Sequence, residues 1–505
     1  MGKTIKNLVW GFLGQFLILA TSIILPRFIL VSFGSEINGV VSTITQIFTY
    51  IALLEAGIGN ASLNRLYKNL AENDKDGISQ TVSATHRYFC QMLPIYGVCV
   101  IAFAIIFPFV IDTEISKSTI IGIILIQGTS GALNFYFTNT YTQLLIADGR
   151  NYISSNLNLM VKLLSTISQI VLITCGLDIV AVQLSFLGAY IIKAIIINVY
   201  VKRKYPWLIQ QRNANTKILE QRNSFLIHEV SGVVFQSTSV VLISLFCSLE
   251  EASVYSIYNM VFVGLSSIFN ILFKGVDFKL GTLFHEDRDK YVKLHDVYET
   301  FYSFFVFSLI STAIVVILPF IKLYTEGIND ANYIDVFLPI LFSIIQILSC
   351  GRAVTSKLIS VSGRAKNTVP NCLAEMVINI VASVIFVNLL GMQGALLGTI
   401  VALLYRSNDM IIYANKRILN RRPIQAYKTL ILNLAVFAIT AIITMIYPIQ
   451  ISNYFDFVIK GLFVLVATSV IYFAINVSLN KIFRETIIEV FKKIKTYKFV
   501  KIGEK

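Results

Sequence analysis

The sequence predicts an all-α, polytopic membrane protein with about 14 transmembrane helices: two six-helix lobes in a parallel pseudo-twofold repeat, plus two appended helices. Composition is the first reason, since 56% of its 505 residues are hydrophobic and 14% are charged, whereas soluble proteins are about 25% charged. Long apolar runs are the second reason, and an internal repeat is the third. Together these observations exclude soluble, disordered and disulfide-stabilised classes.

Fourteen apolar runs are long enough to cross a bilayer, which takes about 20 mostly apolar residues in a helix. None alternates polar and apolar residues as a barrel strand does. The first run is expected to be retained, because its apolar part exceeds the roughly 7–15 residues of a signal peptide. The runs are 8–32, 37–60, 83–111, 118–146, 152–175, 179–201, 224–247, 253–276, 297–321, 334–360, 367–390, 393–415, 428–448 and 454–478.

The basic residues predict the orientation of these runs. If the N-terminus is cytoplasmic, 31 of the 42 Lys and Arg fall on the inner side, eight lie within runs, and three (Lys117, Lys322 and Lys460) fall outside. This positive-inside bias predicts that both termini are cytoplasmic. The net charge of +14 is then an orientation signal, so no nucleic-acid partner is expected. The six cysteines lack CxxC spacing and are expected to be small buried apolar residues.

An internal repeat divides the chain. Ala20–Leu25 (ATSIIL) resembles Ser237–Leu242 (STSVVL) at an offset of 217, and Arg150-Asn151 matches Lys366-Asn367 at an offset of 216. The offset relates span 1 to span 7 in the same orientation, which predicts a parallel repeat. The expected parts are an N-lobe at 1–218, a C-lobe at 219–422, two further spans at 423–478 and a basic cytoplasmic tail at 479–505. The tail is either an amphipathic helix on anionic lipid or a solvated segment.

Enzyme signatures are missing from the sequence. It contains no GxxxxGK[ST], GxSxG, HExxH or GxGxxG motif, and these motifs would indicate nucleotide binding, acyl transfer or metal hydrolysis. Asp287-Arg288-Asp289 matches the DxD of glycosyltransferases, but its loop is too short for a nucleotide-sugar domain. We therefore expect a protein that is not an enzyme and has no catalytic residue, cofactor or metal.

Charges within the apolar runs are the candidate site. A charged side chain at mid-bilayer costs about 2.5–3.5 kcal/mol, so it usually faces a cavity or a partner. Lys193, Lys274, Lys279 and Lys357 lie near run ends and are expected to reach the interface. The predicted cationic cavity, which fits an anionic substrate such as a diphosphate, consists of Arg27, Lys162, Arg352 and Arg406.

Acidic residues occur in the same runs. Glu55, Glu375 and Asp409 could bind Na⁺ or H⁺ for coupling, or they could neutralise the cations. Arg406 and Asp409 are three residues apart, a spacing that also allows an ion pair within one helix.

Residues 33–71 read FGSEINGVVSTITQIFTYIALLEAGIGNASLNRLYKNLA. The Gly34–Gly39 pair, LLEAGIG at 53–59 and LYKNLA at 66–71 resemble the first two spans of bacterial polysaccharide-biosynthesis membrane proteins. These are the O-antigen and capsule repeat-unit flippases of the multidrug/oligosaccharidyl-lipid/polysaccharide exporter superfamily. The plan of fourteen spans resembles that family over the whole chain.

The resemblance implies alternating access by two lobes in the bacterial cytoplasmic (inner) membrane. Its implied substrate is an undecaprenyl-diphosphate-linked oligosaccharide, with membrane lipids and other polysaccharide-assembly proteins as partners. It also implies a substrate-binding arginine at Arg27 in span 1. Three alternatives remain open: a cation-coupled multidrug-type exporter, a lipid II-type flippase, and a glycosyltransferase or scaffold. A second basic residue expected for the lipid II type, about two turns before Arg27, is absent.

Overall fold

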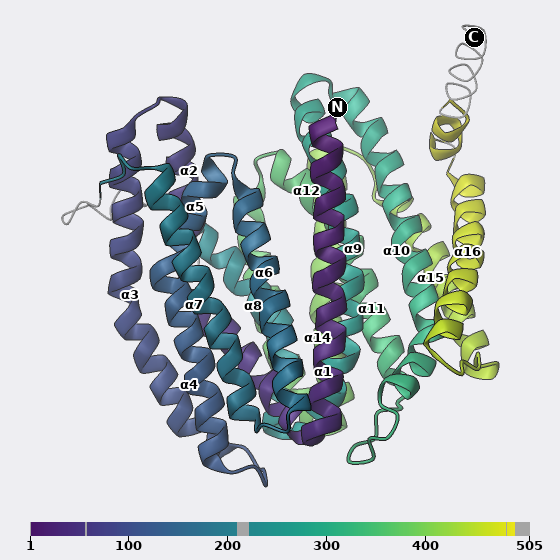
Figure 1. Ribbon diagram of the computed structural model, residues 1–505. Helices are drawn as coiled ribbons and strands as arrows, with labels where there is room; N and C mark the ends of the chain where they lie inside the picture. Colours follow the sequence, from purple (N-terminus) through teal and green to yellow (C-terminus); the bar gives the residue numbers. More distant parts are fainter. Residues whose placement is uncertain (1, 56–57, 210–221, 481, 490–505) are drawn as a thin grey trace, which may run out of the picture. The chain divides into compact units, whose positions relative to one another are not determined.

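The computed structural model of the protein describes residues 2–55, 58–209, 222–480 and 482–489. Throughout these ranges every regular element is helical, which confirms the all-α prediction (Figure 1). Twelve helices in them are long and apolar enough to cross a membrane, and Val230–Phe246 is a shorter apolar helix. The chain is therefore a multi-pass membrane protein, and the count of about fourteen spans stays a prediction.

The helices follow the predicted runs. In the first half they are α1 (Gly2–Ile51), η1 (Ala52–Glu55), α2 (Ile58–Ala71), α3 (Lys75–Val110), α4 (Lys117–Leu133), η2 (Asn134–Thr138), α5 (Asn139–Ala147), α6 (Asn151–Thr174) and α7 (Ile179–Lys204). In the second half they are α8 (Arg222–Phe246), α9 (Leu249–Glu286), α10 (Arg288–Tyr324), α11 (Phe337–Gly351), α12 (Ala353–Val361), η4 (Ala365–Thr368), α13 (Val369–Leu390), α14 (Met392–Tyr413), η5 (Ala414–Ile418), α15 (Ile424–Ile446) and α16 (Tyr454–Leu479). Of the predicted tail 479–505, residues 482–489 are helical, and 490–505 lie outside the described residues.

A glycine divides α1 into the two predicted spans 8–32 and 37–60. Gly34 has φ 83° and ψ 176°, a conformation that only glycine adopts without strain. The helix that restarts at Ser35 is capped by Asp330, whose carboxylate accepts hydrogen bonds from the Ser35 amide at 2.7 Å and from its hydroxyl at 2.5 Å. The chain therefore turns between spans without a separate loop.

The described residues form two compact units by their internal contacts. Unit 1 comprises Met1–Met260, Gly327–Ala331 and Ser383–Ala395, and unit 2 comprises Val261–Glu326, Asn332–Ala382 and Leu396–Lys505. The lobes at 1–218 and 219–422 are a division by sequence repeat, and they stay a prediction.

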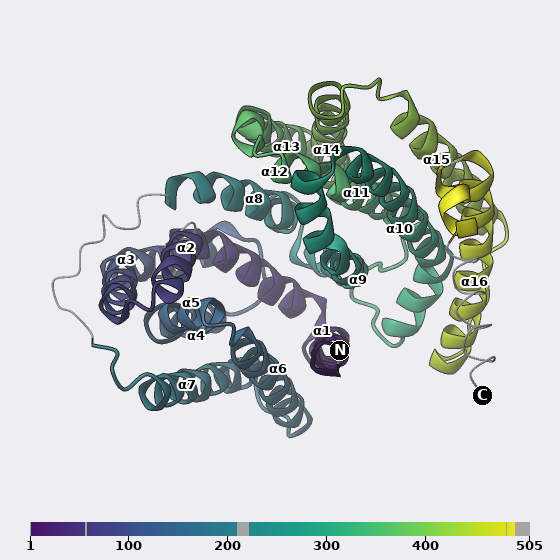
Figure 2. The same ribbon diagram turned by 90° about the horizontal axis from the view of Figure 1, so that it is seen from above.

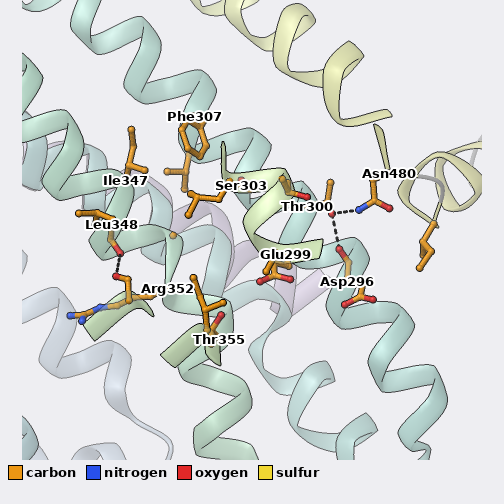
Figure 3. A pocket seen from close by; sticks show the side chains of 18 of the residues that line it. Asp296, Glu299, Thr300, Ser303, Phe307, Ile347, Leu348, Arg352, Thr355 and Asn480 are labelled. Atoms are coloured by element: carbon orange, nitrogen blue, oxygen red, sulfur yellow. Dashed lines mark hydrogen bonds between the residues drawn. The ribbon is translucent and has the colours of Figure 1, made fainter. Parts of the chain in front are cut away.

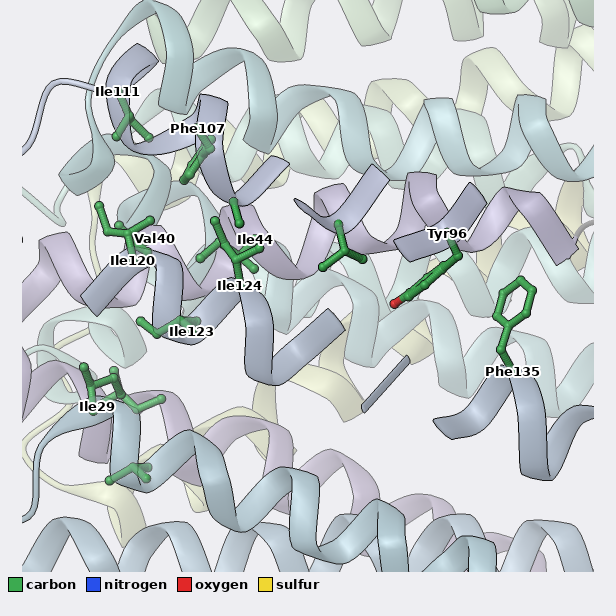
Figure 4. Close-up of a cluster of buried hydrophobic side chains, with 14 of the residues drawn as sticks. Ile29, Val40, Ile44, Tyr96, Phe107, Ile111, Ile120, Ile123, Ile124 and Phe135 are labelled. Carbon is green, nitrogen blue, oxygen red and sulfur yellow. The ribbon is translucent and has the colours of Figure 1, made fainter. Parts of the chain in front are cut away.

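Each unit has its own apolar core. In unit 1, buried side chains from α1, α3 and α4 pack together, including Ile44, Phe107 and Ile124 (Figure 4). In unit 2, α10 lies against α11, α15 and α16 (Figure 2). In α10, 67% of the most apolar stretch is buried, against 17% in α16. Helix α10 is thus the central helix of unit 2, while α16 exposes an apolar surface suited to lipid.

Candidate functional site

A cavity with both polar and apolar walls lies within unit 1, between α1, the α4–η2–α5 segment, α6 and α7. It consists of two adjoining pockets of about 440 and 480 Å³, within the usual size range of ligand sites. Both pockets are lined by Asn134, Lys162, Ser165, Phe186 and Tyr190. We call the two pockets together the N-terminal cavity.

The π-helical turn η2 shapes one wall of this cavity. Residues Asn134–Thr138 widen the helix between α4 and α5, so that residues five apart follow each other along one face. Asn134 and Asn139 are spaced in this way, and the Asn134 amide donates to the Asn139 side-chain oxygen at 3.1 Å. Such turns are frequent at functional sites, because they redirect side chains without breaking the helix.

The two asparagines connect an acid to a base. The Asn139 amide donates to the Glu55 carboxylate, and the Lys193 ammonium donates to the Asn134 oxygen at 2.9 Å. Lys193 is 7% exposed and also lies over the Tyr190 ring, 5.5 Å from its centroid. The expectation that Lys193 reaches the membrane interface is therefore wrong, because α7 directs its side chain inward to Asn134.

Among the residues that the structure describes, Lys162 is the cation of this cavity that has no protein partner. It lies near the middle of α6, a helix of 24 residues, and lines both pockets. Within the described part of the chain, its ammonium makes no hydrogen bond or salt bridge. An ammonium without a protein partner at mid-membrane is available to an anionic ligand.

Arg27 lies on a different face of α1. Leu25 and Ile29 line the N-terminal cavity, and Arg27 is two residues from each of them. At 3.6 residues per turn, two residues correspond to about 200° around the helix. Arg27 is therefore directed away from the wall formed by Leu25 and Ile29, and it lines neither pocket. Its role in substrate binding stays a prediction from the resemblance.

The remaining predicted residues meet in unit 2 as an ion-pair cluster. Arg352 lies at the break between α11 and α12 and binds Glu375 of α13 at 2.6 Å. Arg406 of α14 lies 3.5 Å from Glu375 and 2.6 Å from Asp409, and Asp409 also accepts from Asn371 at 2.7 Å. Glu375 is 5% exposed and Arg406 is 5% exposed. In this arrangement two arginines and two carboxylates neutralise one another.

The two charge clusters differ in how their charges are paired. Among the described residues, the two lysines of the N-terminal cavity have an amide partner (Lys193) or none (Lys162), whereas the arginines of the unit 2 cluster bind carboxylates.

A further pocket, of about 370 Å³, lies within unit 2 between α10, α11, α12, α14, α15 and the side chains of Asn480 and Ile482. We call it the C-terminal pocket (Figure 3). Asp296 binds Arg421 there at 2.7 Å. Burial acts to lower the pKa of Arg421, but the hydrogen bond and charge of Asp296 outweigh it and raise this pKa. His295, Asp296 and Glu299 present possible metal-ligand atoms within 4.8 Å of one another.

Sequence reasoning missed the amides that organise the N-terminal cavity. Asn134 and Asn139 lie inside an apolar run, and their five-residue spacing was a usable signal. Gln169 and Gln183 also line the cavity and carry no charge that a search for ionisable groups would find. Amide side chains hydrogen-bond sugar hydroxyls as readily as they bond one another, so these residues make the cavity suitable for a polar ligand.

The fold resembles that of solved membrane transporters. No family model matches the chain, and no curated protein matches it in sequence. The lipid II flippase MurJ, in an inward closed conformation, has a TM-score of 0.67 at 14% identity, covering 92% of this chain and 97% of its own. An inward-facing MATE family multidrug resistance transporter of the MOP superfamily has a TM-score of 0.62 at 16% identity, covering 80% and 95%. The Vibrio cholerae MATE transporter VcmN, as a mutant, has a TM-score of 0.54 at 12% identity, covering 84% and 99%. The chain therefore shares the fold of these membrane transporters.

Proposed function

We propose that this protein is a flippase that moves undecaprenyl-diphosphate-linked oligosaccharides from the inner to the outer leaflet of the bacterial cytoplasmic membrane. It would act by alternating access, without covalent chemistry, for the assembly of a cell-surface polysaccharide such as O-antigen or capsule. The observation that carries the proposal is the ammonium of Lys162, which has no protein partner among the described residues and lines the N-terminal cavity inside a transporter fold.

The chemistry of the N-terminal cavity supports an anionic, sugar-bearing substrate. Lys162 and Lys193 offer ammonium groups to a diphosphate, and a carboxylate is present at Glu55. Lys acts as a point charge toward phosphate and does not require a fixed geometry. The surrounding asparagine and glutamine side chains would bind sugar hydroxyls, while the lipid tail stays in the membrane. Arg27 remains a proposed further contact, as in the resembling family.

A cation-coupled multidrug exporter is the main alternative, since two of the compared structures are MATE transporters. In the N-terminal cavity or in the ion-pair cluster of unit 2, such an exporter would require a carboxylate that is available to an organic cation. Glu375 and Asp409 already bind arginines, and Glu55 accepts from Asn139. The ion pairs thus favour the anionic substrate. A lipid II-type flippase shares the diphosphate chemistry and differs in its sugars.

Coupling and orientation form part of the same proposal. Both chain ends would lie in the cytoplasm, in keeping with the positive-inside bias. Glu55 is the proposed Na⁺- or H⁺-responsive group, because it is linked to Lys193 through two amides. Arg352 and Arg406 would stabilise unit 2 through their ion pairs with Glu375 and Asp409. Polysaccharide-assembly proteins and membrane lipids are the proposed partners.

The test uses a strain that lacks the gene. We expect undecaprenyl-diphosphate oligosaccharide to accumulate on the cytoplasmic leaflet while surface glycan disappears, and wild-type protein should reverse both. Lys162→Ala should fail to reverse them at normal membrane abundance, whereas Lys162→Arg, which keeps the charge, should restore export in part. Lys202→Ala, at an exposed position on α7, is the matched control. If undecaprenyl-diphosphate oligosaccharide does not accumulate in the deletion strain, the flippase proposal is wrong, and drug-efflux assays would test the multidrug exporter.

A further inference from the structure

The C-terminal pocket has one end with an uncompensated negative charge. Asp296 and Glu299 contribute two carboxylates and Arg421 one guanidinium, and Arg421 binds Asp296. Within the described part of the chain, the Glu299 carboxylate makes no hydrogen bond or salt bridge. Figure 3 shows both carboxylates at the same end of the pocket. His295 also lies 3.3 Å from Asp296, so Asp296 has two basic neighbours and Glu299 is the carboxylate left for a ligand.

The hydroxyl and amide groups at this end have protein partners, whereas Nε2 of the adjacent His295 is buried without one among the described residues. The Asn480 amide donates to the Thr300 hydroxyl at 2.7 Å, and that hydroxyl donates to the Asp296 carbonyl at 2.9 Å. The Ser303 hydroxyl accepts from Asn433 at 3.0 Å, so its own hydrogen and second lone pair are available. The Glu299 carboxylate is therefore the group at this end that a cationic hydrogen-bond donor could bind.

The rest of the pocket is mostly apolar. Its wall consists of Val306, Phe307, Ile347, Leu348, Ile411 and Leu430. At the far end Arg352 is neutralised by Glu375 at 2.6 Å, and Ser407 donates to the Leu348 carbonyl at 3.3 Å. A fitting ligand thus has one positive head group and an apolar body.

We propose that the C-terminal pocket binds a primary ammonium group attached to an apolar body, with the ammonium on Glu299. An ammonium carries three N–H donors, which match the Glu299 carboxylate, the outer lone pairs of Asp296 and the Ser303 oxygen. A quaternary ammonium has no such donor and leaves these acceptors unmet. The ligand is either an aminophospholipid such as phosphatidylethanolamine or a free alkylamine. This site is separate from the N-terminal cavity and does not depend on the flippase proposal.

Native mass spectrometry of the purified full chain in detergent tests the proposal, with phosphatidylethanolamine, phosphatidylcholine, dodecylamine and Zn²⁺ as separate probes. We expect retention of phosphatidylethanolamine, of dodecylamine, or of both, at least tenfold above phosphatidylcholine, and the amine that binds identifies the source. Glu299→Gln should remove this preference. Asp289→Asn is the matched control, because it makes the same charge change at an exposed position of α10.

A second variant tests the pocket without changing Glu299, so that loss of binding can be distinguished from a folding defect of Glu299→Gln. Leu430→Trp fills the apolar part without changing charge, and it should also lower amine retention at least tenfold. Equal retention of the two phospholipids by the wild type would overturn the proposal, as would amine retention that Glu299→Gln leaves unchanged. Binding of Zn²⁺ without binding of either amine would also overturn it and assign His295, Asp296 and Glu299 to a metal instead.

Discussion

Gly39 allows α1 to approach the start of α9 within unit 1, and replacing it with alanine should separate the two. A Cβ built at Gly39 lies 1.9 Å from the Leu249 carbonyl oxygen and 2.7 Å from its carbon. The backbones must then move apart by roughly 1.5 Å to reach ordinary van der Waals contact. The atoms that the new Cβ would meet belong to the Leu249 backbone, so no flexible side chain can move aside to make room.

Hydrogen bonds flank this contact on both sides. Asn38 donates to Ser253 at 2.8 Å, and the Thr43 and Ser244 hydroxyls are 2.5 Å apart. Their loss would cost about 1–3 kcal/mol together, and overpacking adds about 1–3 kcal/mol. Alanine recovers about 1 kcal/mol of helix propensity. The net destabilisation for Gly39→Ala is therefore about 1–5 kcal/mol.

The assay is the apparent melting temperature of the purified full chain in detergent at a fixed scan rate. At an unfolding entropy of about 2.1 cal/mol/K per residue, a central loss of about 3 kcal/mol corresponds to roughly 3 °C for the 505-residue chain. Gly188→Ala in α7 is the matched control, since a Cβ there meets nothing within 4 Å, and its melting temperature should stay the same or rise. Equal melting temperatures for the two alanine variants would refute the steric reasoning.

Three further substitutions test other contacts. Asp330→Ala removes the cap of the helix that restarts at Ser35, and it should cost about 1–2 kcal/mol in thermal unfolding; Asp330→Asn, which can still accept, should cost less. Glu375→Gln leaves buried guanidinium groups underpaired and should cost about 3–5 kcal/mol, so an unchanged melting temperature would contradict the ion-pair cluster. Asn139→Leu breaks the amide link to Glu55 and should reduce glycan export in the complementation assay while the protein stays in the membrane. Export at the wild-type level would rule out a role for that link.

Gly34 and Gly39 are visible as a motif in the sequence, but the structural reason for each glycine is visible only in the structure. Gly34 and Gly39 were singled out in the sequence as part of a resemblance. In the structure Gly34 supplies a positive φ and Gly39 a close backbone approach. The first cause is local, whereas the second depends on Leu249, which lies more than 200 residues further along the chain.

Lysine positions separate what sequence reasoning predicts well from what it predicts poorly. Lys162 was expected to face a cavity because of its depth in an apolar run, and it lines the N-terminal cavity. Lys193 was expected at the interface because of its distance from a run end, yet it bonds to Asn134. Depth along a helix follows from counting residues, but the direction of a side chain around the helix depends on which neighbours pack there.

The sequence by itself determined the membrane class, the helical secondary structure and the positions of the apolar runs, because hydrophobic length and charge placement are properties of contiguous residues. Tertiary structure alone decided which charges remain available. Arg352 and Glu375 are 23 residues apart and meet only because α11 ends beside α13. Lys162 keeps its charge unpaired because no acidic side chain in the described part of the chain reaches it. The spacing of Arg406 and Asp409 within α14 indicates their ion pair, but pairing between helices depends on which helices pack together.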